Sequence, residues 1–198
     1  MPKFSRQELR AMSSFKSAVT FAKKTNPIRP EIEGFISQNF YKSYGANVSY
    51  FSQVLVSCNN QDDKLIAAFG ITNLANRRAY LEQYLSNPIE TEISTFVGKS
   101  VKRSEIFELG NLAATYPGAT RKLIQKMAVD LYDLGAKWVV FTANNLVINA
   151  FQKLNLNPIL LKEANPDLLP NGGANWGSYY EDKPQVMFIE VPQPHERK

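Results

Sequence analysis

The feature that most constrains this chain is the alternation of apolar runs and helical patterns between residues 101 and 156. The apolar run 106–114 leads through a short turn into a stretch whose apolar residues recur at helical spacing. A second apolar run, 138–143, leads into a second helical pattern, for which Asn144 and Asn145 are cap candidates. The connections are so short that consecutive elements must pack side by side. The segment therefore predicts a strand–helix–strand–helix unit.

Further elements precede and follow this unit. A helical pattern over 28–44 comes before two β-type runs, 49–58 and 64–72, which a polar turn joins into a hairpin. A weaker helical pattern covers 89–96, and two short strand patterns after residue 156 flank a loop rich in Asn, Pro and Gly. We therefore expect an α/β (α+β) domain, built as a mixed, twisted sheet with helices on both faces.

Positive charge is concentrated at the start of the chain. Residues 1–30 contain seven Lys or Arg and one Glu, a net charge of +6, whereas the whole chain carries +5. The remainder sums to −1, so we do not expect a nucleic-acid-binding protein. Helical spacing predicts that residues 1–27 form a basic amphipathic segment ahead of a single domain at 28–198. Three roles stay open for this segment: a helix packed on the domain, docking of an acidic partner such as a carrier protein or nucleic acid, or contact with a membrane.

Several chemistries lack the residues that they need. The single histidine, His195, lies in a polar tail, which argues against a serine–histidine hydrolase and a histidine-based zinc site, and we expect no metal. The chain has neither a P-loop nor a G-x-G-x-x-G motif. The remaining catalytic groups are carboxylates, tyrosines, asparagines and backbone amides, and these suit proton transfer and polarisation of a carbonyl.

The sequence also bears on where the protein works. No apolar stretch approaches the roughly 20 residues of a membrane span, and the first residues lack the apolar core of a signal peptide. Cys58 is the single cysteine, so an internal disulfide is impossible, which agrees with a reducing cytosol. We therefore expect a cytoplasmic protein.

Four strings between about Arg29 and Phe188 resemble the thermostable hemolysin family of bacterial proteins: YLEQYLSNPIE, FELGNLAATYPGATRKLI, WVVFTANNLVINAFQKLNLNP and WGSYY. The order of elements also resembles the GNAT acyltransferase fold, in particular its acyl-homoserine-lactone synthase branch. The family name implies lysis of red cells. The fold implies transfer of an acyl group from coenzyme A or an acyl carrier protein to an amine.

The resemblance also implies where an acyl donor would bind, namely between strands 105–114 and 138–143. The turn after the central strand exposes backbone N–H groups at a helix N-terminus, which suits a phosphate. The GNAT pattern for this turn is Gln/Arg-x-x-Gly-x-Gly/Ala; Gly118 fits it, whereas Thr115 and Thr120 depart from it. These departures fit a carrier-protein donor or a site that has lost its cofactor. The candidate donor-binding residues are Leu112, Ala113, Ala114, Gly118, Ala119, Thr120, Arg121, Asn145 and Asn149.

Glu108 is the leading catalytic candidate. It lies between Phe107 and Leu109 in an apolar strand, so its carboxylate must face a cleft, find a partner or carry a raised pKa. A pKa near neutrality would make it a usable general base. The resemblance aligns it with an active-site glutamate of the homoserine-lactone synthases, whereas Asn111 stands near the place of their arginine. The alternative is a glutamate that pairs with a lysine or with buried amides.

Glu82 is a second catalytic candidate, because it sits among the apolar and aromatic residues 79–85. A surface position on an edge strand is the alternative. Rings on the Gly-rich loop could close over a substrate or could anchor the loop. The candidate substrate-binding residues are Gln83, Tyr84, Asn111, Trp176, Tyr179 and Tyr180.

The best interpretation is an N-acyltransferase that moves an acyl group from a coenzyme A or carrier-protein thioester to a small molecule bearing an amine. Two rivals stay open. One is a membrane-active hemolysin, and the other is a catalytically inactive binding module with a GNAT fold.

Overall fold

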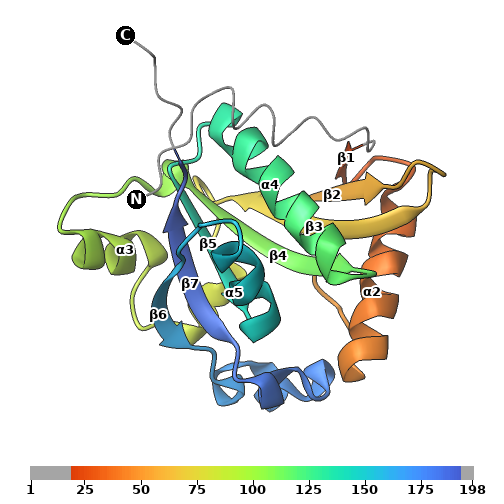
Figure 1. Cartoon of the computed structure of the whole chain (residues 1–198). Helices are drawn as coiled ribbons and strands as arrows, with labels where there is room; N and C mark the ends of the chain where they lie inside the picture. Colours follow the sequence, from red (N-terminus) through yellow and green to blue (C-terminus); the bar gives the residue numbers. More distant parts are fainter. Residues whose placement is uncertain (1–18, 193–198) are drawn as a thin grey trace, which may run out of the picture.

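The computed structural model describes residues 19–192 as one seven-stranded sheet flanked by helices (Figure 1). The strands are β1 (Val19–Lys23), β2 (Val54–Asn59), β3 (Leu65–Asn73), β4 (Ile106–Ala114), β5 (Trp138–Ala143), β6 (Ile159–Glu163) and β7 (Gln185–Glu190). The α-helices are α2 (Arg29–Tyr44), α3 (Ile89–Val97), α4 (Pro117–Asp133) and α5 (Asn145–Gln152). Short 3-10 helices connect them: η1 (Tyr80–Tyr84), η2 (Arg103–Glu105), η3 (Pro166–Leu168), η4 (Pro170–Trp176) and η5 (Tyr179–Asp182).

The strand order is β1-β2-β3-β4-β5-β7-β6. β4 and β5 are parallel, and every other neighbouring pair is antiparallel. The mixed sheet, the β2–β3 hairpin and the strand–helix–strand–helix unit predicted from the sequence are therefore confirmed. The parallel pair needs α4 as its crossover, because parallel neighbours cannot be joined by a tight turn.

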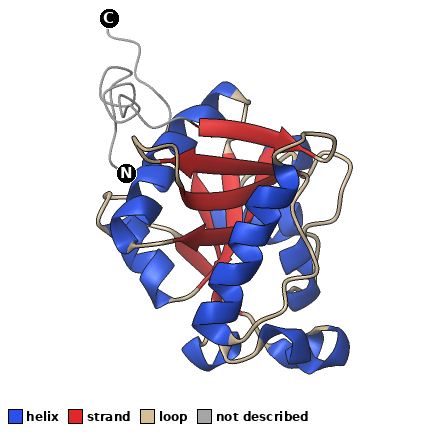
Figure 2. Cartoon of the chain, turned by 90° about the vertical axis from the view of Figure 1, so that its right-hand side faces the viewer, coloured by secondary structure: helices blue, strands red, loops and turns tan. Residues whose placement is uncertain are grey.

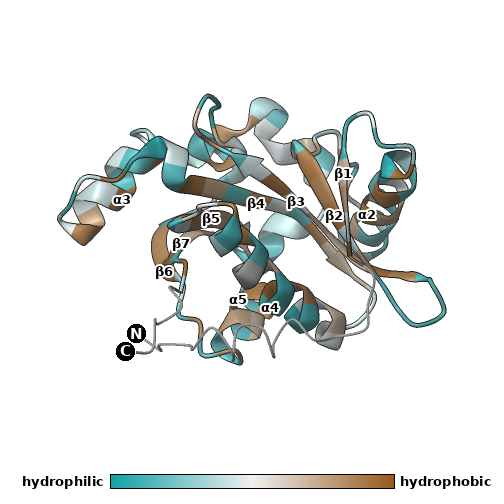
Figure 3. Ribbon diagram, turned by 90° about the horizontal axis from the view of Figure 1, so that it is seen from above, coloured by the Kyte–Doolittle hydropathy of each residue, from teal (hydrophilic) through white to brown (hydrophobic). Residues whose placement is uncertain are grey.

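Helices cover both faces of the sheet, as expected from the sequence (Figure 2). α4 and α5 pack on one face, where Phe107 and Leu109 of β4 join their apolar residues in the largest core cluster. On the opposite face, α2 packs over β2 and β3, and η1 and α3 pack near Ile106. Figure 3 shows that the strands are largely apolar and that the helices beside them carry more polar residues. Glu108 alternates with Phe107 and Leu109 and therefore points to the face of η1.

The pairing between β4 and β5 covers only the first half of β4. It runs from Ile106–Trp138 to Leu109–Phe141 and then ends, although both strands continue. On its other edge, β4 carries one extra residue between Gly110 and Ala113 relative to β3, which is a β-bulge. Asn111 in this bulge has a left-handed backbone with φ 53°. The bulge turns the second half of β4 away from β5 and leaves a gap in the sheet.

Two local predictions are wrong. Val19–Lys23, expected within an amphipathic helix, forms the edge strand β1, and residues 1–18 of that expected segment lie outside the described part of the chain. The buried guanidinium of Arg29 donates to the carbonyl oxygens of Ala22 and Ser52 and so ties β1 and the start of β2 to α2. Residues 49–53 of the strand expected at 49–58 are irregular. None of the helices within residues 19–192 is long and apolar enough to cross a membrane.

The segment between β6 and β7 is docked on the C-terminal end of α2. The amide of Ser178 donates to the carbonyl oxygen of Tyr44 at 2.8 Å, and the amide of Asn47 donates to that of Asn175 at 2.7 Å. Gly177 makes this approach possible. A Cβ atom built at Gly177 would lie 1.9 Å from the Tyr44 oxygen, and the residue has φ 53°. The aromatic residues on either side of Gly177 are thereby held against α2.

We predict that Gly177→Ala destabilises the protein by about 3 kcal/mol or more, because the new methyl group collides with backbone. Gly172→Ala in the same loop is the matched control, since Gly172 also has a positive φ but no atom lies within 4 Å of the place that the alanine methyl group would take. The control should lose only about 1 kcal/mol from backbone strain. Urea unfolding of both variants measures the difference. Equal losses would show that the loop is not docked through Gly177.

Candidate active site

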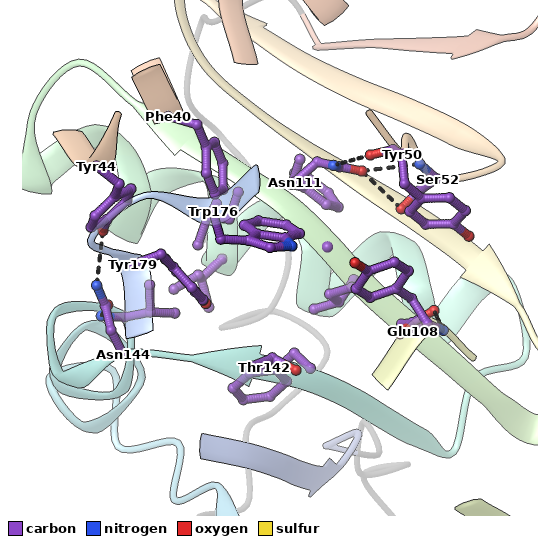
Figure 4. Close-up of a pocket in the computed structure, with 18 of the residues that line it drawn as sticks. Phe40, Tyr44, Tyr50, Ser52, Glu108, Asn111, Thr142, Asn144, Trp176 and Tyr179 are labelled. Atoms are coloured by element: carbon purple, nitrogen blue, oxygen red, sulfur yellow. Dashed lines mark hydrogen bonds between the residues drawn. The ribbon is translucent and has the colours of Figure 1, made fainter. Parts of the chain in front are cut away.

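A cavity of about 130 Å³ lies where β4 and β5 separate (Figure 4). Side chains from both faces of the sheet line it. Leu112 of β4 and Phe141 of β5 belong to the α4–α5 side, whereas Glu108 and Trp176 belong to the opposite side. The cavity therefore connects the two faces through the gap in the sheet, and its two arms have different chemistry.

The arm on the α4–α5 side, which we call the aliphatic arm, is lined by six aliphatic side chains and three phenylalanines and is the more apolar of the two. It is enclosed between the diverging strands and the inner faces of the two helices. Because its walls offer dispersion contacts and few polar partners, this arm suits a hydrocarbon chain. Its lining residues are Phe69, Leu109, Leu112, Leu123, Ile124, Met127, Phe141, Val147 and Phe151.

The arm on the opposite side is aromatic. Trp176 lies near its centre in Figure 4, with Phe40 and Tyr179 to one side and Glu108 to the other. Seven of the rings form a continuous wall, in which neighbouring centroids are 4.9 to 6.4 Å apart, and Tyr84 joins this wall through its hydroxyl, which contacts that of Tyr180. The residues of this wall are Phe40, Tyr44, Tyr50, Tyr80, Tyr84, Trp176, Tyr179 and Tyr180.

Glu108 carries the charged group of the cavity. Its side chain is buried, and its two carboxylate oxygens accept the backbone N–H groups of Tyr80 and Leu81 at 2.9 and 2.8 Å. Burial raises the pKa of Glu108 to about 7, although the two amide bonds work in the opposite direction. The partners of Glu108 are thus buried amides, as the alternative interpretation expected. Even with these partners, the carboxyl group has a pKa near neutrality and lines a cavity. Such a group can take up a proton at physiological pH.

Glu82 does not line the cavity. It lies beneath η1, where its carboxylate accepts the amides of Ala79 and Ile89 and forms an ion pair with Arg103 at 2.8 Å. Arg103 also pairs with Glu90 of α3. Burial alone would raise the pKa of Glu82, but the bonds from Arg103 and the two amides together lower it. This network fixes η1 and with it the two amides that hold Glu108, so Glu82 lies outside the cavity that Glu108 lines.

Asn111 lines the cavity, but its amide group serves the backbone. Its oxygen accepts the N–H and hydroxyl of Ser52 at 3.0 and 3.2 Å, and its nitrogen donates to the carbonyl oxygen of Tyr50 at 2.8 Å. These bonds join the β4 bulge to the segment before β2. They also place the Tyr50 ring at the aromatic wall.

Two further polar contacts close the aromatic arm. Asn144 caps α5 by accepting the Val147 amide, and its nitrogen donates to the Tyr44 hydroxyl at 2.9 Å. The hydroxyls of Tyr84 and Tyr180 lie 2.6 Å apart. Of the predicted substrate-binding residues, the cavity brings together Tyr84, Asn111, Trp176, Tyr179 and Tyr180. Gln83 lies outside it and donates to the Tyr80 carbonyl oxygen.

The predicted donor-binding residues are more scattered. Leu112 lines the cavity, whereas Ala113 is buried under α2, and Asn145 and Asn149 are exposed. Tyr116 gives α4 no side-chain cap, so the first turn of this helix, with Gly118, Thr120 and Arg121 nearby, presents backbone N–H groups of the kind that bind anions. One of these groups, the N–H of Ala119, already donates to the carbonyl oxygen of Tyr116. Within residues 19–192, no group of three His, Cys, Asp or Glu residues could hold a metal ion.

Sequence reasoning missed several residues that line the cavity. The sequence identifies Asn144 as a helix cap, but its contact with the cavity depends on the hydroxyl of Tyr44, which is distant in sequence. Tyr50 precedes β2 in a segment for which the sequence predicts a strand, and Tyr80 has no local signal that sets it apart from its aromatic neighbours. Thr142 interrupts the apolar run of β5 one residue before its end, and this interruption is its one visible signal.

The raised pKa of Glu108 predicts a pH-dependent stability. Its contribution is fully present below the unfolded pKa of about 4.5 and is lost as pH rises through the folded value of about 7. The free energy of unfolding of the wild type, relative to Glu108→Gln, should therefore fall by about 3 kcal/mol between pH 4.5 and 7.5. Chemical denaturation across this range measures the difference.

Glu82→Gln is the matched control, because it makes the same change at the second buried carboxylate. The lowered pKa of Glu82 gives the opposite slope: its contribution is present above the unfolded pKa and is lost as pH falls through the folded pKa. Removing this partner of Arg103 should cost about 3 kcal/mol at neutral pH. Parallel pH profiles for the two variants would contradict the assigned environments.

Comparisons with solved structures support the fold at low sequence identity. FeeM, an N-acyl amino acid synthase from uncultured soil microbes, is 12% identical, with a TM-score of 0.58 over 91% of this chain and 94% of that chain. The AHL synthase LasI is 11% identical, with a TM-score of 0.58 over 89% and 90%. BjaI, a CoA-dependent acyl-homoserine lactone synthase solved with SAM and isopentyl-CoA, is 9% identical, with a TM-score of 0.55 over 89% and 84%.

These likenesses show that the fold is the GNAT-like acyltransferase fold expected from the sequence. The comparison with curated proteins gave no match. The sequence profile of the thermostable hemolysin family matches residues 22–195, which is most of the chain. The chain therefore belongs to the thermostable hemolysin family.

Proposed function

We propose that the protein is an N-acyltransferase that moves an acyl group from a thioester of coenzyme A or an acyl carrier protein to a small molecule bearing an amine. The observation that carries this proposal is the cavity through the sheet, which joins an aliphatic arm to an aromatic arm at Glu108. The similar structures named above include synthases of acyl-homoserine lactones and N-acyl amino acids, which agrees with such a reaction.

The two arms suggest how the substrates divide the cavity. The acyl chain occupies the aliphatic arm between α4 and α5, and the thioester lies in the gap between β4 and β5. Past Leu109, the edge of β4 that faces this gap has no β5 ladder partner, so main-chain groups around Leu112 are in place to orient the thioester carbonyl. The acceptor amine enters through the aromatic arm and meets the thioester beside Glu108.

The proposed reaction uses Glu108 as general base. The amine nitrogen attacks the thioester carbonyl carbon, the new C–N bond forms and the C–S bond breaks. Glu108 removes a proton from the amine nitrogen, and the leaving thiolate takes up a proton to become the free thiol. A carboxyl group with a pKa of about 7 is matched to this task, because it is largely ionised just above neutral pH and still basic enough to accept the proton.

The donor hypothesis predicts chain-length-dependent binding. Calorimetry should show that decanoyl-coenzyme A or decanoyl-carrier protein binds more tightly than the corresponding acetyl thioester, because the aliphatic arm buries the longer chain. Met127→Trp should fill that arm. The substitution should weaken binding of the decanoyl thioester at least roughly tenfold, while binding of the acetyl thioester persists. If no thioester binds to the wild type, the donor hypothesis is wrong and the inactive binding module becomes the better interpretation.

The general-base hypothesis predicts a selective loss of rate. Glu108→Gln should lower kcat/KM for acyl transfer by about 100- to 10,000-fold while thioester binding persists. In the wild type, kcat/KM should rise with pH up to about 7 and then level off.

Glu105→Gln is the matched control for this rate measurement. Glu105 directly precedes β4 and pairs with the exposed Lys137, away from the cavity. Its substitution should leave the rate within about threefold, since surface ion pairs contribute little. A Glu108→Gln enzyme that folds and keeps its turnover would refute the assigned role.

A further inference from the structure

Among the residues that the structure describes, the aromatic arm has one charged group and eight aromatic side chains. The charge is the carboxylate of Glu108, which lies at the end of the arm toward β4. Within the described part of the chain, no Lys, Arg or His lines the cavity. The electrostatic character of the arm is therefore negative, both from the carboxylate and from the faces of the rings.

The rings surround Glu108 closely. The rings of Tyr50 and Tyr80 stack with centroids 4.9 Å apart, and the centroid of the Trp176 ring lies 6.2 Å from that of Tyr80. These three rings form one corner of the arm, which we call the ring corner. Tyr50, Tyr84 and Glu108 line the same cavity, and the negative charge of Glu108 adds to burial in raising the pKa of both tyrosines. Ring faces and a carboxylate therefore meet in one small volume.

This combination favours a cation. Faces of Tyr and Trp attract an ammonium group through the ring quadrupole, and the attraction increases when water is excluded. A carboxylate in the same place would face Glu108 and the negative faces of the rings, and no residue among 19–192 that lines the cavity offers it a cationic partner, so its burial is costly. The cation that acts on Tyr50 from outside is Arg77, whose side chain is exposed and does not line the cavity.

We propose that the acceptor is a primary amine that enters as an ammonium cation and carries no carboxylate group. This inference rests on the proposed acyl transfer and narrows its acceptor to simple amines, as opposed to amino acids. The ammonium group binds between the ring corner and Glu108. Glu108 then takes one proton from the ammonium group, and the amine nitrogen attacks the thioester carbonyl carbon to form the C–N bond. A second proton passes from that nitrogen to the sulfur as the C–S bond breaks, so that the products are the amide and the free thiol.

Matched acceptor pairs test the proposal. Tyramine and tyrosine differ only by the carboxylate, and so do phenethylamine and phenylalanine. With decanoyl-coenzyme A or decanoyl-carrier protein as donor, thiol release and amide product should show kcat/KM about 100-fold or more higher for each amine than for its amino acid, because an unpaired charge is rejected. Equal values, or higher values for the amino acids, would overturn the inference.

Variants at Tyr50 separate the ring from the hydroxyl. Tyr50 is partly exposed, so its replacement should leave the fold intact. Tyr50→Phe keeps the ring face and should leave KM for tyramine within about threefold, whereas Tyr50→Leu should raise KM by roughly tenfold with little change in kcat. Equal KM values for the two variants would overturn the cation–ring contact.

Arg77→Gln tests the competing role of the outer cation. The variant should leave the preference for tyramine over tyrosine unchanged. If the wild type prefers tyrosine and Arg77→Gln abolishes that preference, Arg77 binds the acceptor carboxylate and the inference is wrong, although acyl transfer itself stands.

A binding measurement without donor distinguishes the inference from the proposed function. Tyramine should raise the melting temperature of the wild type more than tyrosine does at equal concentration, and Tyr50→Leu should reduce the shift. Preferential tyramine binding without transfer from any thioester would support the amine site while overturning the acyltransferase proposal. If tyramine and phenethylamine neither bind nor accept an acyl group while tyrosine or phenylalanine is acylated, the amine site is wrong and the acyltransferase proposal stands.

Discussion

The end of the β4–β5 ladder at Leu109 is the feature on which the rest of the site depends. Both strands continue past this point, but the bulge at Asn111 turns β4 toward β3 and away from β5. A continuous sheet would have separated the aliphatic pocket on one face from the aromatic pocket on the other. The three hydrogen bonds between the Asn111 side-chain amide and Tyr50 and Ser52 tie the bulge to the segment before β2, and they satisfy the carbonyl oxygen of Tyr50 and the N–H group of Ser52.

The two buried glutamates show how environment separates residues of the same type. Glu82 has a guanidinium and two amides as partners, and its pKa falls; Glu108 has two amides and no ion pair with a described residue, and its pKa rises to about 7. Glu82 and Arg103 hold η1 in place, and η1 supplies the amides that orient Glu108. The strongly paired carboxylate thus stabilises the scaffold, while the weakly paired one retains the basicity that proton transfer requires.

The sequence predicted the β4–α4–β5–α5 unit because its apolar periodicities are long and its connections short. It also indicated an unusual environment for Glu108, because a lone carboxylate in an apolar strand has few acceptable environments; the structure shows it buried at a cavity, and its catalytic role stays a prediction. Val19–Lys23 was misjudged because five residues are too few to separate strand from helix periodicity. The partner of Glu82, Arg103, is distant in sequence, and the aromatic wall depends on Gly177 docking against Tyr44, a contact that no local pattern encodes.

The central claim is that the acyl chain and the acceptor occupy opposite arms of one cavity and meet beside Glu108. A crystal structure of the protein with the non-hydrolysable ketone analogue of decanoyl-pantetheine, in which a methylene group separates the carbonyl carbon from the sulfur, tests it most directly. We predict density for the alkyl chain between Met127 and Phe151, with the carbonyl in the gap between β4 and β5 on the side of Glu108. Density for the chain in the aromatic arm, or anywhere outside the cavity, would contradict the claim.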